Sequence, residues 1–125
     1  MISDNQKELR LICDYFILPI VITIVNKNRL ELKDSPYTLR SLYTAIASII
    51  INRMRADLES VRGQLKELNI SVIHTKEQQD GDWGRFPYLY QGRRLEFVIQ
   101  KETARQEIKA RLKRYMKEAL RFSCS

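Results

Sequence analysis

Few residues in this sequence have the type and spacing for catalysis or metal binding. His74 is the only histidine, and no Ser, Cys or carboxylate near it completes a nucleophile–base pair. Glu77, Asp80 and Asp82 offer carboxylates, but they lack the twelve-residue pattern and closing glutamate of a calcium loop. The sequence also has no glycine-rich phosphate loop, HExxH motif or CxxC pair. We therefore expect no catalytic residues, no cofactor and no metal, and a protein that is not an enzyme.

Positive charge is concentrated in the last third of the chain. Residues 1–82 carry eleven Lys or Arg and eleven Asp or Glu, whereas residues 83–125 carry eleven and four. The second segment therefore holds the entire net charge of +7. Such asymmetry indicates a polyanionic partner, because Lys and Arg that neutralise phosphates release counterions. The alternative is a solvated basic face that keeps the protein soluble.

The charge excess follows a regular pattern in residues 101–121, which we expect to form a basic amphipathic helix. Two ladders repeat at every fourth residue. One is apolar and is expected to dock on the core: Ala104, Ile108, Leu112, Met116 and Leu120. Because four residues turn a helix about 40° past a full circle, both ladders wind around its axis. The other ladder is basic: Lys101, Arg105, Lys109, Lys113, Lys117 and Arg121. Together with Arg93 and Arg94, this basic ladder forms the predicted nucleic-acid-binding set.

A helix is expected over residues 5–28, where apolar residues recur at intervals of three and four. Pro19 predicts a kink, and the β-branched residues 20–25 leave a strand as the alternative. The apolar run of residues 15–25 is about half the length of a membrane span. Acidic residues precede it and no cleavage site follows, so it is not a signal peptide. We expect no membrane association.

A long helix is expected over residues 36–68, with Ser35 as its cap and Pro36 in its first turn. Asn69 suits the left-handed end of a helix, and Gly63 is a point where the helix could break. A heptad seam runs along it: Ala47, Ile51, Met54, Leu58, Val61, Leu65 and Leu68. At about 50 Å, this helix is too long for so small a domain to cover alone, which predicts a homodimer. The alternative is that the first helix covers the seam within one chain.

Antiparallel strands are expected over residues 70–100, with Gln91 and Gly92 as a two-residue turn. Phe86, Tyr88 and Tyr90 alternate along one strand, so packing explains these aromatic residues better than nucleic-acid contact does. Pro87 is expected at an edge because it cannot donate a hydrogen bond to the sheet. Trp83 is not assigned to the core.

Together these elements predict a single α+β domain of 125 residues, rich in helix. It combines two long antiparallel helices, a short antiparallel hairpin or meander, and a C-terminal helix. Cys13 and Cys124 are far apart and outside any paired motif, which favours reduced thiols and a cytoplasmic location.

The layout also resembles that of small uncharacterised proteins of spore-forming bacteria. The likeness lies in "DYFILPIVITIV", the long second helix, and "RRLEFVIQKETARQEIKARLKRYM" near the end. It extends over most of the chain and includes no diagnostic motif. The resemblance implies a bacterial cytoplasmic protein and assigns neither an activity nor site residues.

Two functional hypotheses follow. The first is a non-enzymatic nucleic-acid-associated protein that presents the basic set to phosphates. A winged-helix version requires a turn near residues 54–56 or at Gly63, against the uninterrupted seam. The second hypothesis is a homodimeric interaction or regulatory module that binds an acidic protein partner.

Overall fold

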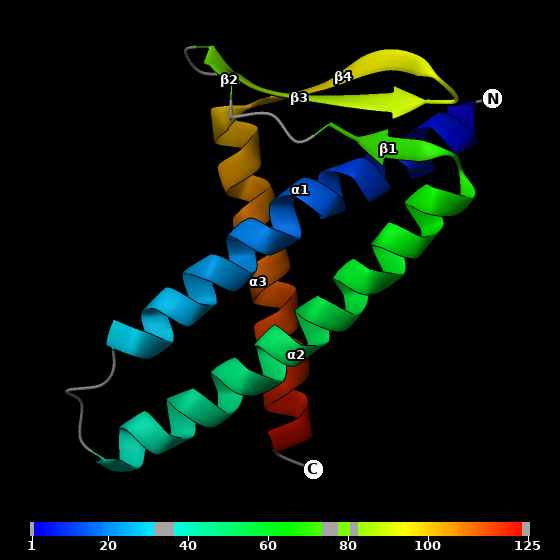
Figure 1. Cartoon of the computed structure of the whole chain (residues 1–125). Coiled ribbons are helices and arrows are strands. Elements are labelled where there is room, and N and C mark those ends of the chain that lie inside the picture. Colours follow the sequence, from blue (N-terminus) through cyan, green and yellow to red (C-terminus); the bar gives the residue numbers. More distant parts are fainter. Residues whose placement is uncertain (1, 32–36, 74–77, 81–82, 124–125) are drawn as a thin grey trace.

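The computed structural model describes residues 2–31, 37–73, 78–80 and 83–123. Within these residues, helices α1 (Ile2–Glu31) and α2 (Tyr37–Glu67) come first, and helix α3 (Lys101–Ser123) comes last (Figure 1). Between them are four strands: β1 (Ile70–Val72), β2 (Gln78–Asp80), β3 (Trp83–Tyr90) and β4 (Arg93–Gln100). The fold is α+β and rich in helix, as predicted.

Helix α1 continues through Pro19, so the expected kink does not end it. Pro19 is exposed, and the hydroxyl of Thr23 donates to its carbonyl oxygen at 2.9 Å. Leu18 and Val21, on either side of the proline, are fully buried. Burial of this apolar face outweighs the weak helix preference of the β-branched residues. The strand alternative for residues 20–25 is therefore wrong.

Helix α2 is a single unbroken helix that passes through Gly63. A Cβ added at Gly63 would meet no atom within 4 Å, so this position faces open space. The chain turns at Asn69, whose φ of 59° is left-handed, and the N–H of Asn69 donates to the carbonyl of Lys66 at 3.1 Å. This end of the helix was predicted correctly, whereas the proposed cap at Ser35 and Pro36 lies outside the described residues. Helix α2 has no turn near residues 54–56 or at Gly63, so it contains no helix-turn-helix, and the winged-helix hypothesis is wrong.

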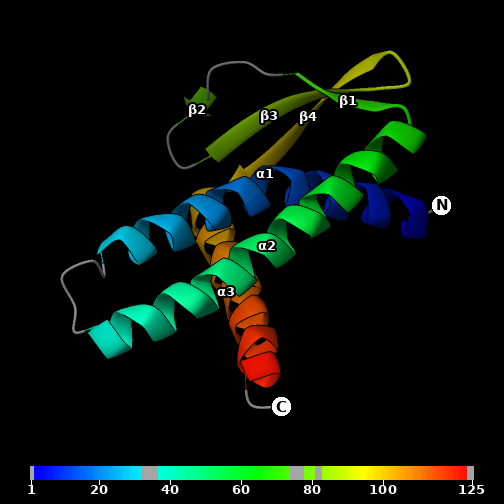
Figure 2. The ribbon, with the colours of Figure 1, turned by 60° about the horizontal axis from the view of Figure 1, so that its bottom comes forward.

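The heptad seam of α2 is covered by α1 of the same chain. The two helices run antiparallel and side by side (Figures 1 and 2). Six seam residues are buried: Ala47, Ile51, Met54, Leu58, Val61 and Leu65. They share two apolar clusters with buried residues of α1: Leu11, Ile12, Ile17, Leu18, Val21 and Val25. The seam therefore needs no second chain, and the argument for a dimer from helix length is wrong.

Strand β3 is the central strand of the sheet. It pairs with β4 along its whole length, and with β1 and β2 in turn on its other side, always antiparallel. Gln91 and Gly92 form the β3–β4 turn with positive φ angles of 50° and 82°, as predicted. Pro87 lies in this central strand, so its predicted edge position is wrong. Its carbonyl accepts from the N–H of Ile73 just beyond β1, and no residue of β1 or β2 pairs with Pro87, so neither strand needs its missing N–H.

One face of the hairpin packs on α1. The ring of Phe16 stacks on Phe86 with centroids 4.3 Å apart, and Phe97 lies at 6.2 Å from Phe16. Tyr88 is buried, and the hydroxyl of Tyr90 donates to Glu8 at 3.1 Å. The aromatic residues of the hairpin therefore belong to the core, as predicted. The side chain of Trp83 lies outside the described residues.

Helix α3 follows β4 directly, extends away from the sheet and crosses the α1–α2 pair (Figure 2). Its Tyr115 and Ala119 join the cluster that contains Val21 and Met54. The three helices thus share one core, while the sheet packs on a second cluster at the other end of α1 and α2. None of the helices in the described ranges has the length and hydropathy of a membrane-spanning segment.

Candidate functional site

The buried side of α3 differs from the apolar ladder expected from the sequence. Ala104, Ile108 and Leu112 are half-buried against the core, as predicted. Met116 and Leu120 instead remain 44% and 48% exposed, so the second half of the ladder does not dock. Tyr115 and Ala119 are buried in their place. Residues at four-residue intervals turn about 40° around the helix axis at each step, so the ladder gradually leaves the side of α3 that contacts the core.

The basic ladder lies on the solvent side of α3. All six of its members are exposed: Lys101, Arg105, Lys109, Lys113, Lys117 and Arg121. Lys113 is two residues before Tyr115, which places it about 200° away around the helix, opposite the buried side. Arg105 forms an exposed ion pair with Glu102 at 3.4 Å. No ion pair joins Lys109, Lys113 or Lys117 to any residue that the structure describes.

Arg93 and Arg94 are exposed but lie apart from the ladder. They begin β4 beside the turn, whereas α3 begins after the other end of that strand. At about 3.3 Å per residue, the length of β4 separates them from the start of α3 by roughly 25 Å. The structure therefore places these two arginines at the opposite end of β4 from the start of the ladder.

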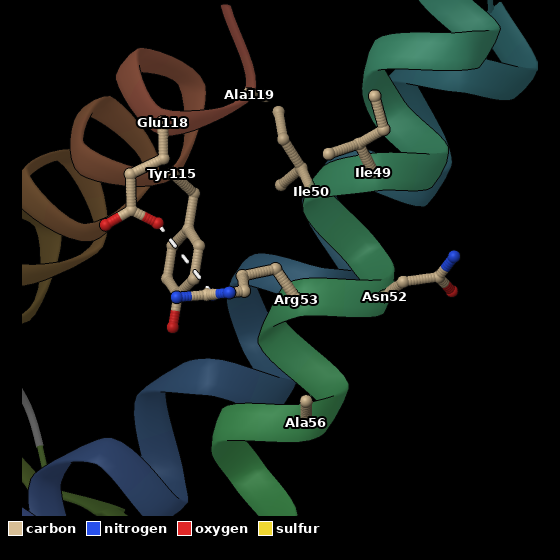
Figure 3. Close-up of a pocket in the computed structure, with 8 residues that line it drawn as sticks. All are labelled: Ile49, Ile50, Asn52, Arg53, Ala56, Tyr115, Glu118 and Ala119. Carbon is tan, nitrogen blue, oxygen red and sulfur yellow. Dashed lines mark ion pairs between the residues drawn. The ribbon is translucent and has the colours of Figure 1, made fainter. Parts of the chain in front are cut away.

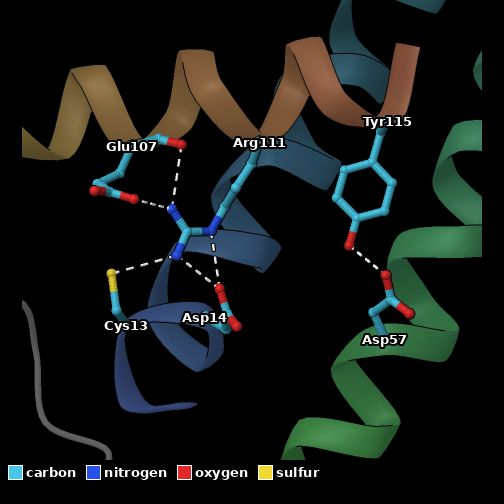
Figure 4. Close-up of polar contacts among 6 residues, drawn as sticks. All are labelled: Cys13, Asp14, Asp57, Glu107, Arg111 and Tyr115. Atoms are coloured by element: carbon cyan, nitrogen blue, oxygen red, sulfur yellow. Dashed lines mark hydrogen bonds and ion pairs between the residues drawn. The ribbon is translucent and has the colours of Figure 1, made fainter. Parts of the chain in front are cut away.

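The most extensive polar contacts of α3 belong to Arg111, which sequence analysis did not single out. Its Nε and Nη2 donate to Oδ1 of Asp14 at 2.9 and 2.6 Å, and Nη1 donates to the Glu107 carboxylate (Figure 4). Nη2 also lies 3.6 Å from the Sγ of Cys13. The side chain of Arg111 is only 9% exposed. These contacts join the middle of α3 to α1.

The carboxylates in this cluster stabilise the positive charge of Arg111. Burial lowers the pKa of the Arg111 guanidinium, but hydrogen bonds to Asp14 and Glu107 outweigh burial and raise it above its usual value. Burial also raises the pKa of the Cys13 thiol, an effect that nearby Arg111 only partly offsets. Since the thiolate is the nucleophilic form, this raised pKa makes the Cys13 thiol less reactive.

A groove of about 780 Å³ runs beside this cluster between α1 and α3. Its charged lining residues are Arg10, Asp14, Glu107, Arg111 and Arg114. Asp14 and Glu107 already accept hydrogen bonds from Arg111, so the central guanidinium is occupied within the chain. We therefore assign the cluster to holding α1 against α3.

A second polar contact joins α3 to α2. The hydroxyl of Tyr115 donates to Oδ2 of Asp57 at 2.5 Å (Figure 4). Burial and the neighbouring carboxylate raise the pKa of Tyr115 to about 12. The phenol therefore stays protonated near neutral pH and acts as a hydrogen-bond donor across the helix interface.

Part of the Arg111 cluster had a signal in the sequence. Asp14 is the only charged residue between residues 11 and 26. A carboxylate on an apolar helix requires a hydrogen-bonding or cationic partner when it is buried. This signal predicts a cation beside Asp14, but it does not identify Arg111 among the many basic residues.

The other candidate groups lie outside what the structure describes. His74, Glu77 and Asp82 are not described, nor is the side chain of Asp80. Within the described ranges, no three His, Cys, Asp or Glu side chains gather where they could hold a metal ion. The expected absence of catalytic and metal sites therefore stays a prediction.

Comparison with known proteins places the chain in a family. A family model described as YhjD protein matches residues 3–120, nearly the whole chain. No curated protein and no solved structure matches the chain.

Proposed function

The chain belongs to the YhjD protein family, and we propose that it is a non-enzymatic binding protein whose helix α3 binds the phosphates of nucleic acids. One observation supports this proposal. Lys109, Lys113 and Lys117 lie on the side of α3 opposite the core, and no described residue pairs with them. Their ammonium groups are free to exchange counterions for phosphates.

The arrangement favours contact with the backbone of a nucleic acid. Lysines at four-residue spacing lie about 6 Å apart along the helix axis, so neighbouring lysines can reach different phosphates. Arg105 and Arg121 extend this row at its two ends. Contacts to phosphates position a protein without reading bases, so we expect little sequence preference.

Fluorescence anisotropy with random-sequence duplex DNA and single-stranded RNA tests the proposal. We expect micromolar binding at low salt and a linear fall of log affinity with log salt concentration. Replacing Lys109, Lys113 and Lys117 together by Gln should weaken binding to all sequences about equally. The salt slope should decrease by about 2 to 3, close to one unit for each lost phosphate contact.

A matched control variant distinguishes the effect of this row of lysines from the effect of lowering the net charge. Lys7, Lys27 and Lys66 are exposed lysines of α1 and α2, and their replacement by Gln removes the same charge. This control variant should bind nearly as wild type does. Equal weakening of both variants, or no binding by wild type at low salt, would contradict a phosphate-binding face on α3.

Arg93 and Arg94 provide a separate test because they lie at the far end of β4. If they belong to the same binding surface, their replacement by Gln should weaken binding as strongly per residue as the lysine changes. Because the two regions are separated, we expect a smaller effect.

A second candidate function is binding to a protein partner that carries acidic residues. It is favoured by exposed apolar side chains on α2 and by an apolar groove between α2 and α3. The predicted homodimer would need a surface other than the seam, because α1 covers the seam. Sedimentation velocity at micromolar concentration tests for a dimer.

We further propose that the protein works in the cytoplasm of spore-forming bacteria. The two isolated cysteines and the layout resemblance support this location. Fractionation of cells that express a tagged chain tests it, and recovery with the membrane or culture medium would contradict it.

A further inference from the structure

Helix α3 leaves two large apolar side chains in solvent. Met116 and Leu120 are both nearly half exposed. They directly follow the buried residues Tyr115 and Ala119, and a step of one residue turns each of them about 100° away from the core. Both side chains therefore lie toward the solvent side of α3, where the row of lysines also lies.

Each of these apolar side chains has a lysine as its neighbour. Residues three apart on a helix lie side by side on its surface. Met116 therefore adjoins Lys113, and Leu120 adjoins Lys117. Lys109 lies one turn before Lys113, so one line along α3 carries two lysines and then the two apolar residues. Cations and apolar groups thus share one exposed face.

The acids of α3 do not neutralise this face. Glu118 is two residues after Met116, about 200° away around the helix. It lines the groove between α2 and α3, where its carboxylate lies 4.0 Å from the Nε of Arg53 (Figure 3). The other two acids of the helix also pair with arginines: Glu107 with Arg111, and Glu102 with Arg105. The part of α3 that carries the two apolar residues therefore keeps its positive charge.

A partner that matches this face presents anionic groups and apolar surface close together. A duplex presents its phosphates outside and keeps its bases paired and stacked inside. A single strand presents phosphates together with the faces of unpaired bases. An anionic bilayer buries a continuous apolar stripe of a helix, with the cations on the opposite face. Here Lys113 lies on the same line as Met116, so a bilayer that buried one would also bury the other.

We propose that α3 binds single-stranded nucleic acid in preference to duplex. Its lysines contact phosphates, while Met116 and Leu120 pack against the faces of unpaired bases. The thioether of Met116 suits this contact, because sulfur packs favourably against aromatic rings. The inference rests on the proposed function, phosphate binding by the same helix, and adds the class of nucleic acid to it.

Fluorescence anisotropy with two DNA probes tests the preference. One probe is labelled oligo-dT, and the other is the same labelled strand annealed to oligo-dA. Charge alone favours the duplex, because a duplex carries more phosphates for a given length. A preference for the single strand therefore reports contacts with bases. We expect the wild-type chain to bind the single strand about fivefold more tightly than the duplex at equal salt.

Variants of the two apolar residues identify the surface that contacts bases. Met116→Gln with Leu120→Gln should weaken single-strand binding about tenfold and change duplex binding by less than about twofold. The salt slope should stay the same, because no phosphate contact is lost. The matched control is Leu30→Gln with Leu42→Gln, two exposed leucines of α1 and α2, which should bind both probes as wild type does. Met116→Phe should strengthen single-strand binding about threefold, because an aromatic ring stacks on bases.

The outcomes separate this inference from the proposed function. Equal affinity for the two probes, or equal weakening on both when Met116 and Leu120 are changed to Gln, would overturn the inference and leave phosphate binding intact. No binding to either probe at low salt would overturn both. Sedimentation with vesicles of phosphatidylserine and phosphatidylcholine tests a membrane surface as the partner. Vesicle binding that the two Gln changes abolish, with no effect of those changes on the DNA probes, would assign the face to lipid and also overturn the inference.

Discussion

Arg111 and Lys113 are two residues apart on the same helix, yet they lie in opposite environments. Arg111 is buried among Asp14, Glu107 and Cys13, whereas Lys113 points into solvent with no described ion pair. A step of two residues turns a helix by about 200°, which is enough to move a cation from one environment to the other. The cations of one basic segment are therefore either buried against carboxylates or left in solvent, according to the face of the helix that they occupy.

Because Arg111 and Lys113 lie in different environments, substitutions at the two positions should have different effects, one on folding stability and the other on binding. A buried cation that neutralises two carboxylates cannot be removed without leaving those carboxylates uncompensated. An exposed lysine next to other lysines contributes repulsion more than cohesion. Changes at Arg111 should therefore affect folding, and changes at Lys113 and its neighbours should affect partners.

The largest effect is expected from Arg111→Met. The change leaves Asp14 and Glu107 without their cation in a partly buried site and should lower the free energy of unfolding by about 3 kcal/mol. Urea denaturation followed by circular dichroism measures it. Adding Asp14→Asn should restore part of the loss, since it removes one uncompensated charge. A loss below about 1 kcal/mol would show that Arg111 is not a structural cation.

A smaller effect is expected from Tyr115→Phe, which removes the donor to Asp57. The unpaired carboxylate should cost about 1–2 kcal/mol near neutral pH. The folded protein holds the pKa of Tyr115 at about 12, above its ordinary value of 10.0. This contribution is therefore full below pH 10 and declines as the pH rises toward 12. Urea denaturation at several pH values should show the two proteins converging over that interval, and a constant difference would contradict this assignment.

The smallest effect on stability is expected when Lys109, Lys113 and Lys117 are all changed to Gln. The change relieves four like-charge pairs at four-residue spacing (105/109, 109/113, 113/117 and 117/121) and, at about 0.2 kcal/mol for each exposed pair, should raise the free energy of unfolding by about 0.8 kcal/mol. Gln and Lys have similar helix propensity, so no opposing loss is expected. Urea denaturation beside wild type measures the change. A loss above about 1 kcal/mol would place these lysines with Arg111 in a structural role.

Much of the secondary structure could be predicted because its causes are local. The helix predicted over residues 36–68 is observed as Tyr37–Glu67, and that predicted over residues 101–121 as Lys101–Ser123. Gln91 and Gly92 form the predicted two-residue turn, which requires positive φ angles, and Gly92 adopts such an angle without strain. Propensity, periodicity and turn chemistry act over a few residues, so they are visible in the sequence.

The sequence-based predictions that were wrong concern contacts between residues that are distant in the sequence. The long seam of α2 gives no sign of whether α1 or a second chain covers it. Pro87 is compatible with a central strand because neither β1 nor β2 pairs with it. Met116 and Leu120 fit the apolar ladder, but the line along which α3 crosses the other helices excludes them.

The features of the candidate surfaces also divide into those set by local sequence and those set by contacts between distant residues. The amino-acid pattern alone established that positive charge gathers on the last helix, since that follows from composition and the 100° turn per residue. Only the folded chain determined that Arg111 meets Asp14, 97 residues away in sequence, and that Arg93 and Arg94 lie apart from α3. The physical reason is that a helix defines the angular positions of its own side chains, whereas the crossing of helices decides which of those side chains lose water and acquire partners.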